Sequence, residues 1–194
     1  MAGHLTLAPE LDAFRHAFEQ IADEGEALAG ALTDGQFNWR PQPDAWSAAQ
    51  CIEHLNVTAR VYLPSLDEGI ADARQRGLYG EGPFRYNWIG RKFVQSQALP
   101  VKRKFKAAQV FTPPPSRPRG EAMAAFRAYQ VQFIDRLRQA NGLDLSRARV
   151  KSPAVTWLRL PLGSGFELMI AHERRHLWQA SQVIADPAFP RSGR

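Results

Sequence analysis

Apolar residues recur every three or four positions in four separate segments of this 194-residue chain. This spacing places them on one face of a helix, and that face must be buried against other helices. The first segment begins at Leu11, and the others lie within residues 47–67, 123–137 and 166–184. The sequence therefore predicts an all-α fold, a four-helix bundle with a long crossover connection.

Capping and helix-breaking residues predict where these helices begin and end. Ser47, with Gln50 three residues later, forms a capping box that starts the second helix. Pro64 is expected to kink or end that helix, because proline lacks the backbone N–H that an inner helical turn needs. Asn141-Gly142 is expected to end the third helix, and Asp186-Pro187 the fourth.

The connections between the helices differ in length and composition. Thr33-Asp34-Gly35 is expected to stop the first helix. Residues of about 77–119 are rich in glycine, proline and basic side chains, and we interpret them as the long connector, with a short helix around 88–95. Residues 149–160 favour an extended connector, and the glycines after it place the start of the fourth helix near Phe166.

Length and composition fit one domain spanning residues 1–194, with its core at about 10–185. Cys51 is the single cysteine, so the chain cannot form an internal disulfide. The N-terminus lacks the basic start and apolar run of a secretory signal, and no segment reaches the roughly 20 apolar residues that span a bilayer. We therefore expect a cytoplasmic protein that does not bind membranes.

The formal net charge of +6 raises the question of nucleic-acid binding. Most basic residues are scattered, but one cluster lies within the long connector, in a segment that also holds Trp88 and Phe93. The cluster comprises Arg91, Lys92, Lys102, Arg103, Lys104 and Lys106. Charge runs usually keep a segment solvated, so we expect no nucleic-acid partner. The rival interpretation, a basic nucleic-acid binder, predicts affinity that falls steeply with salt.

His172 and His176 lie four residues apart, on one face of the fourth predicted helix. Apolar residues surround that face, so both imidazoles are expected to face the core, where a metal ion can satisfy them together. His54 lies at the edge of the apolar face of the second helix and can reach the same region. Three imidazoles leave positions open for water or substrate, as in catalytic zinc sites, and also suit nickel, iron, copper and cobalt. His4 and His16 are not expected to contribute.

Two other interpretations of these histidines remain open. Each ring could hydrogen-bond to a backbone carbonyl or a carboxylate and have a structural role alone. Residues 172–176 also match H-E-x-x-H, in which the glutamate is the general base of a zinc protease. The following residues lack the glycine and histidine of the metzincin extension, and no glutamate follows Glu173, so we do not favour a protease.

Several motifs occur in a characteristic order along the chain, and together they resemble the DinB-like superfamily over roughly residues 10–185. The motifs are WRPxPxxWSxxQxxxHL at residues 39–55, VKRKFK at 101–106, FTP at 111–113 and HERRHxxQ at 172–179. The resemblance implies a four-helix bundle in which His54, His172 and His176 hold a divalent metal. Zinc or nickel is the common ion in that family, and iron or manganese is also compatible.

The same resemblance suggests classes of function. Relatives include thiol S-transferases that use bacillithiol, mycothiol or glutathione, a maleylpyruvate isomerase and metal-dependent hydrolases. It therefore implies a metal-dependent transferase or hydrolase that acts on a small molecule, with a low-molecular-weight thiol as a candidate partner, and a homodimeric assembly. The alternative is a non-catalytic protein of stress response that binds metal or a small molecule.

Five further residues are candidates for secondary roles. Cys51 could be an additional ligand or a redox-sensitive neighbour, although we interpret it as a small buried residue. Glu173 lies about 100° around the helix from the first histidine of the pair, so it is expected to point away from a metal. Gln179 could orient a ligand or lie at a cavity rim. Trp39 and Trp46 are expected to pack over the start of the second helix.

Overall fold

The computed structural model describes residues 6–100, 109–155 and 157–191. Four long helices, α1, α3, α5 and α6, dominate it, and this confirms the predicted all-α four-helix bundle. In chain order the elements are α1 (Pro9–Ala29), α2 (Asp34–Asn38), α3 (Ala48–Gln75), α4 (Trp88–Gln97), the 3-10 helix η1 (Gln109–Phe111), α5 (Arg119–Ala140), β1 (Arg149–Lys151), β2 (Arg159–Pro161) and α6 (Leu162–Ile184).

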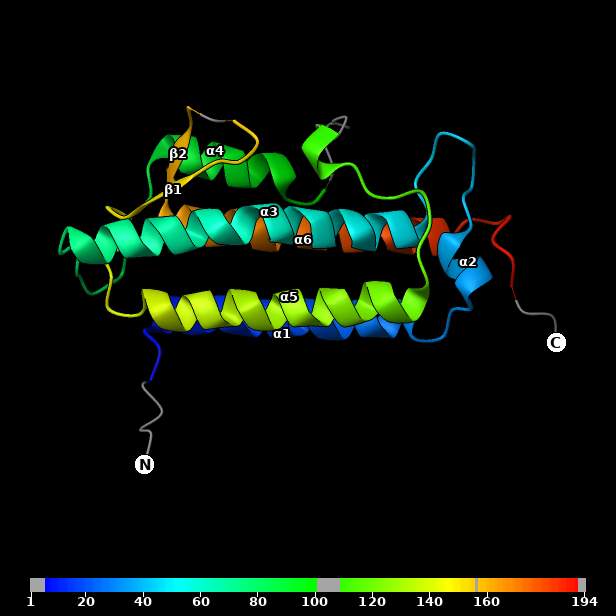
Figure 1. The fold of residues 1–194 in the computed structure, drawn as a ribbon, viewed down its shortest axis with the longest axis horizontal. Coiled ribbons are helices and arrows are strands. Elements are labelled where there is room, and N and C mark those ends of the chain that lie inside the picture. Colours follow the sequence, from blue (N-terminus) through cyan, green and yellow to red (C-terminus); the bar gives the residue numbers. More distant parts are fainter. Residues whose placement is uncertain (1–5, 101–108, 156, 192–194) are drawn as a thin grey trace.

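The four long helices form a square arrangement. α1 and α3 each pack against both α5 and α6, so α1 lies diagonally opposite α3. Figure 1 shows α3 and α6 side by side in one layer and α1 and α5 in the other. The long connection from α3 to α5 carries α4 and η1, and α4 packs against α6 on the outside of the bundle. The groove between α3 and α6 is therefore covered by the connector.

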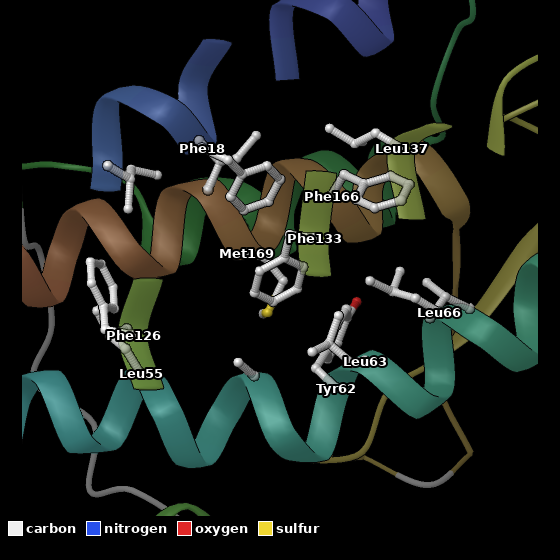
Figure 2. Close-up of a cluster of buried hydrophobic side chains, with 14 of the residues drawn as sticks. Phe18, Leu55, Tyr62, Leu63, Leu66, Phe126, Phe133, Leu137, Phe166 and Met169 are labelled. Atoms are coloured by element: carbon white, nitrogen blue, oxygen red, sulfur yellow. The ribbon is translucent and has the colours of Figure 1, made fainter. Parts of the chain in front are cut away.

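Aromatic and aliphatic side chains from all four long helices fill the interior of the bundle (Figure 2). Phe18 of α1 stacks on Phe133 of α5, with ring centroids 4.9 Å apart and planes inclined by 4°. Leu66 of α3 and Phe166 of α6 are also fully buried. Burying one such side chain contributes about 1.5–3 kcal/mol, so these contacts are a main source of the stability of the bundle.

The start of α3 agrees with its sequence signal, but its length does not. The Ser47 side chain accepts a hydrogen bond from the backbone N–H of Gln50, and the Gln50 side chain accepts one from Ser47 N–H. Of the two outcomes expected for Pro64, a kink or an end of the helix, the second does not occur, because α3 continues to Gln75. Pro64 lies on the solvent-exposed face next to exposed Arg60, so water can reach the carbonyl that loses its N–H partner.

Thr33-Asp34-Gly35 has a role that the sequence analysis missed, because it starts a helix. α1 ends at Ala29, and Thr33 then caps the short helix α2. Its hydroxyl accepts from Gln36 N–H at 3.2 Å, while Gln36 Oε1 accepts from Thr33 N–H at 2.9 Å. Phe37, which is fully buried, attaches α2 to the core. Thr33-Asp34-Gly35, which was expected to stop the first helix, therefore starts α2, and α1 has already ended before it.

The fourth bundle helix begins earlier than predicted, at Leu162 rather than near Phe166. Its first turn contains Gly163 and Gly165, which the sequence analysis placed before the helix. A Cβ at Gly163 would overlap the Tyr86 hydroxyl oxygen, and a Cβ at Gly165 would lie 2.7 Å from Val150 Cγ1. These glycines therefore permit close packing within a helix and do not break it.

The connectors largely follow their predicted character. β1 and β2 form a short antiparallel ribbon in which Val150 pairs with Leu160, within the segment expected to be extended. α4 confirms the short helix expected around residues 88–95, and Lys92 lies over the ring of Trp88 at 5.0 Å. Lys102, Arg103, Lys104 and Lys106 lie outside the described residues. Within the described ranges, none of the helices is both long and apolar enough to cross a membrane.

Candidate metal centre

Two neighbouring helices bring three histidine side chains together. α3 contributes His54, and α6 contributes His172 and His176. The ring centroids lie 4.4 Å apart for His54 and His176, 4.6 Å for His172 and His176, and 5.1 Å for His54 and His172. One ring nitrogen of each residue lies within 4.8 Å of those of the other two. The tertiary structure thus joins the residues that the sequence analysis selected.

The orientation of the His54 ring is set by the connector. Its Nδ1 lies 2.7 Å from the carbonyl oxygen of Phe111 in η1. A carbonyl oxygen only accepts, so neutral His54 carries its proton on Nδ1 and keeps a lone pair on Nε2. Arg117 anchors the same connector, because its Nη1 contacts the buried carboxylate of Glu53 at 3.1 Å and its backbone N–H donates to the Asn38 side chain. Glu53, the neighbour of His54 in the chain, therefore helps to position the Phe111 carbonyl that accepts from the His54 ring.

Glutamine side chains contact the corresponding nitrogen of the other two rings. His172 Nδ1 lies 3.3 Å from Oε1 of Gln97 at the end of α4, and His176 Nδ1 lies 3.1 Å from Oε1 of Gln179, one turn along α6. Both rings therefore donate from Nδ1 and keep a lone pair on Nε2. Histidines that bind metals are commonly oriented in this way by a hydrogen bond from the second nitrogen. Gln179 therefore orients His176, and this refines the role considered for it from the sequence.

The chemistry of the three rings fits a divalent cation. Among the described residues, His172 Nε2 is buried and has no hydrogen-bond partner. Burial lowers the pKa of His176 to about 3, keeps the pKa of His172 well below its usual value, and lowers that of His54 against the opposing effect of the Phe111 hydrogen bond. The rings are consequently neutral at pH 7, which is the form that coordinates a metal. A cation between them would satisfy a lone pair that is otherwise costly to bury.

A cavity of about 820 Å³ adjoins the three histidines, between α3, α6 and the connector. Trp46, Phe93 and Val155 contribute apolar surface to it. The Trp46 ring lies 5.0 Å from the His54 ring and 5.9 Å from that of His176. The sequence analysis expected Trp46 only to close the core over α3, whereas it also forms one wall of the site. The arrangement can accommodate a small organic molecule beside a metal.

Glu173 does not face this cavity. It is 2% exposed, and its Oε1 accepts a hydrogen bond from Gln130 Nε2 of α5 at 3.3 Å. Burial raises the pKa of its carboxyl group to about 8. A zinc protease with the H-E-x-x-H motif needs this glutamate beside the metal, so the geometry agrees with the expectation that Glu173 points away.

The remaining candidates from the sequence lie elsewhere. Cys51 is fully buried in the core, burial raises the pKa of its thiol to about 12, and in the described part of the chain the group of candidate ligands within mutual reach consists of the three histidines. Trp39 packs edge-on against Phe189 rather than at the site. His16 is exposed on α1 and contacts the backbone of Asp12. His4 lies outside the described residues.

Three participants were missed by the sequence analysis: the Phe111 carbonyl, the Gln97 amide and the apolar wall at Phe93. All three belong to the connector between α3 and α5. No helical spacing relates them to the histidines, so a periodic pattern could not identify them. Two of the family motifs fall in this connector. VKRKFK at residues 101–106 lies outside the described residues, and FTP at residues 111–113 begins with Phe111.

Comparisons with known proteins agree with this architecture. The model of the DinB superfamily matches residues 17–180. YfiT from Bacillus subtilis, described as a probable metal-dependent hydrolase with an unusual four-helix bundle topology, has a similar structure, with a TM-score of 0.59. The two are 12% identical, and the alignment covers 95% of this chain and 92% of YfiT, so the similarity establishes a shared fold. No curated protein matches this sequence. Because the family model spans most of its length, the chain belongs to the DinB superfamily.

Proposed function

We propose that this protein is a metal-dependent hydrolase that binds a divalent transition ion through His54, His172 and His176. The convergence of three neutral imidazoles, each with its Nδ1 engaged in a hydrogen bond, is the observation that carries the proposal. When bound, such an ion acts as a Lewis acid and makes a water or a thiol nucleophilic near neutral pH. The description of YfiT as a hydrolase supports the same class of reaction.

The residues around the three rings have separable roles in this proposal. Phe111 and Gln179 engage Nδ1 of two of the rings, which leaves the lone pair on Nε2 free for a metal. Trp46 shields the site from bulk water on one side, which strengthens electrostatic interactions inside the cavity. Glu173 takes no part as a base, because its carboxyl group faces α5.

A thiol S-transferase is the second candidate, and the size of the cavity favours it. A cavity of about 820 Å³ lies in the upper part of the range of roughly 300–1,000 Å³ that is usual for ligand pockets, so it has room for a low-molecular-weight thiol. Both reactions depend on the same three histidines. Assays of ester and amide hydrolysis, run in parallel with thiol transfer from glutathione, bacillithiol or mycothiol, distinguish the two candidates.

Elemental analysis of untagged, unchelated protein tests the metal site directly. We expect about one equivalent of a transition metal in the wild type, and its loss in His54→Ala and in the double variant His172→Ala, His176→Ala. His16→Ala, which removes an exposed histidine of α1, is the matched control and should retain the metal. A wild type that binds no metal after reconstitution would refute the proposal. Metal bound without turnover of any substrate would favour a non-catalytic binding protein.

A further inference from the structure

The cavity beside the histidines continues along α3. Thr58 and Tyr62 line it together with His54. These three positions follow one another at four-residue spacing, so they share one face of α3, and each is displaced by one turn, roughly 6 Å, from the previous one. A molecule that reaches from the histidines along this face therefore meets two hydroxyl groups in succession.

Both hydroxyl groups are buried without a partner. Thr58 is 6% exposed and Tyr62 is 3% exposed. Within the residues that the structure describes, neither Thr58 Oγ1 nor Tyr62 Oη makes a hydrogen bond. Thr58 thus departs from the usual behaviour of a buried helical threonine, which bonds to a carbonyl of the preceding turn. Buried polar groups without partners weaken a fold, so two of them on one wall of a cavity indicate that a ligand supplies the partner.

The packing of α6 leaves room for the Tyr62 hydroxyl. Figure 2 shows Tyr62 projecting from α3 into the bundle. Gly165 lies in the first turn of α6, and a Cβ there would be 3.0 Å from Tyr62 Oη. Any larger residue at this position would press on the hydroxyl group. The glycine therefore preserves the space at this end of the cavity.

Charge is distributed unevenly along the cavity. Its acidic lining residues are Asp44, which precedes α3, and Asp186, which follows α6. Thr58 and Tyr62 lie further along α3, on the side of the histidines away from both acids. Arg175, which also lines the cavity, donates from Nη1 to the Ser96 carbonyl at 3.0 Å. An anionic group is thus repelled from one end of the cavity and tolerated at the other.

We propose that Thr58 and Tyr62 form a subsite that binds the carboxylate of a small substrate with an apolar body. An ionised carboxylate has only acceptor atoms, and each hydroxyl has one hydrogen to donate to it. The assignment of the reacting end rests on the proposed function, because that end lies at the three histidines. The subsite itself consists of residues outside the histidine cluster and is accessible to test without a metal.

The experiment is calorimetric titration of the full-length protein, in metal-loaded and metal-depleted forms, with phenylacetate and with phenethyl alcohol as its uncharged counterpart. In both forms the wild type should bind phenylacetate about tenfold more tightly than the alcohol. Tyr62→Phe and Thr58→Val should each weaken phenylacetate binding about tenfold and leave alcohol binding unchanged. Thr58→Ser, which keeps a hydroxyl group, should retain most of the affinity.

Tyr129→Phe is the matched control, because it removes a tyrosine hydroxyl from a separate pocket between α3 and α5. It should bind both probes as the wild type does. Equal affinity of the wild type for the two probes, no binding of phenylacetate, or unaltered binding in Tyr62→Phe and Thr58→Val would each overturn the subsite. Elemental analysis of the same samples keeps the two proposals separate, since selective phenylacetate binding by a wild type that takes up no metal on reconstitution would refute the metal-dependent function alone.

Discussion

The Nδ1 atom of His54 lies 2.7 Å from the carbonyl oxygen of Phe111, 57 residues further along the chain. This contact ties the ring on α3 to the connector that covers the groove between α3 and α6. The connector is itself attached beside the ring, through the pair formed by Arg117 and Glu53. The orientation of one candidate ligand therefore depends on how a long connection is anchored.

Arg117→Ala should weaken metal binding by about tenfold, because outer-shell contacts commonly contribute that much to metal affinity. The substitution removes the charged partner of the buried Glu53 carboxylate, which keeps its contact with Asn56, and leaves the connector that carries the Phe111 carbonyl with one anchoring contact fewer. Competition with a chromophoric chelator measures the affinity. Arg76→Ala, which removes an exposed ion pair at the end of α3, is the control and should bind metal as the wild type does. Unchanged affinity in Arg117→Ala would show that the connector is anchored by other contacts.

Gln179→Leu should lower metal affinity by about 10–100-fold, because it removes the acceptor that orients His176 at similar side-chain volume. Gln182→Leu is the control on the same helix. The Gln182 side chain also lines the cavity, but its amide contacts Ser181. Both affinities follow from chelator competition at pH 7. Equal losses in the two variants would indicate a general effect of leucine in the cavity rather than loss of an oriented ring.

Glu173→Gln should retain the metal and should be more stable than the wild type at alkaline pH. Burial raises the pKa of Glu173 to about 8 in the folded protein, above the usual value of 4.5. The folded state therefore favours the protonated form, and the contribution to stability is fully present below pH 4.5 and is lost as the pH rises through 8. Glutamine stays neutral, so the variant does not incur this loss.

Urea unfolding of metal-depleted wild type and Glu173→Gln at several pH values tests this expectation. The difference in the free energy of unfolding should favour the variant at pH 9 and diminish towards pH 5, following the direction of the Glu173 pKa shift. The opposite slope would mean that the carboxylate is ionised in the core. Loss of metal in Glu173→Gln would instead place this residue at the metal, as the protease motif requires.

Gly165→Ala should destabilise the protein by about 1–3 kcal/mol, since added methyl groups in a filled core force their neighbours to move. The new Cβ would lie 2.7 Å from Val150 Cγ1 and 3.0 Å from Tyr62 Oη. Val150→Ala removes the first of these atoms, so the double variant should lose less stability than the sum of the two single variants. Thermal and urea unfolding measure these differences. If the stability losses of the two single variants simply add, the new Cβ does not press on Val150, and α6 must have moved away from β1.

Local signals in the sequence were sufficient for the bundle because they act within one or two helical turns. The stripe that includes Phe18 follows from the 3.6-residue period, and Ser47 with Gln50 marks a helix start through contacts three residues apart. The pair His172 and His176 shares a face for the same reason. Pro64 does not end its helix and Gly163 lies inside one, because their effects depend on what lies outside the helix: solvent beside the proline, and the Tyr86 ring against the glycine.

The sequence by itself determined the four helices and the three histidines that the bundle could bring together, since both follow from the period of a helix. Only the tertiary structure decided that the Phe111 carbonyl and the Gln97 amide orient two of those rings and that Trp46 forms a wall of the cavity. It also decided that the Tyr62 hydroxyl lies there with no hydrogen-bond partner among the described residues. These features depend on contacts between residues far apart in the chain. Such contacts leave no periodic pattern in the sequence, because they form only when the connector between α3 and α5 packs against α3 and α6.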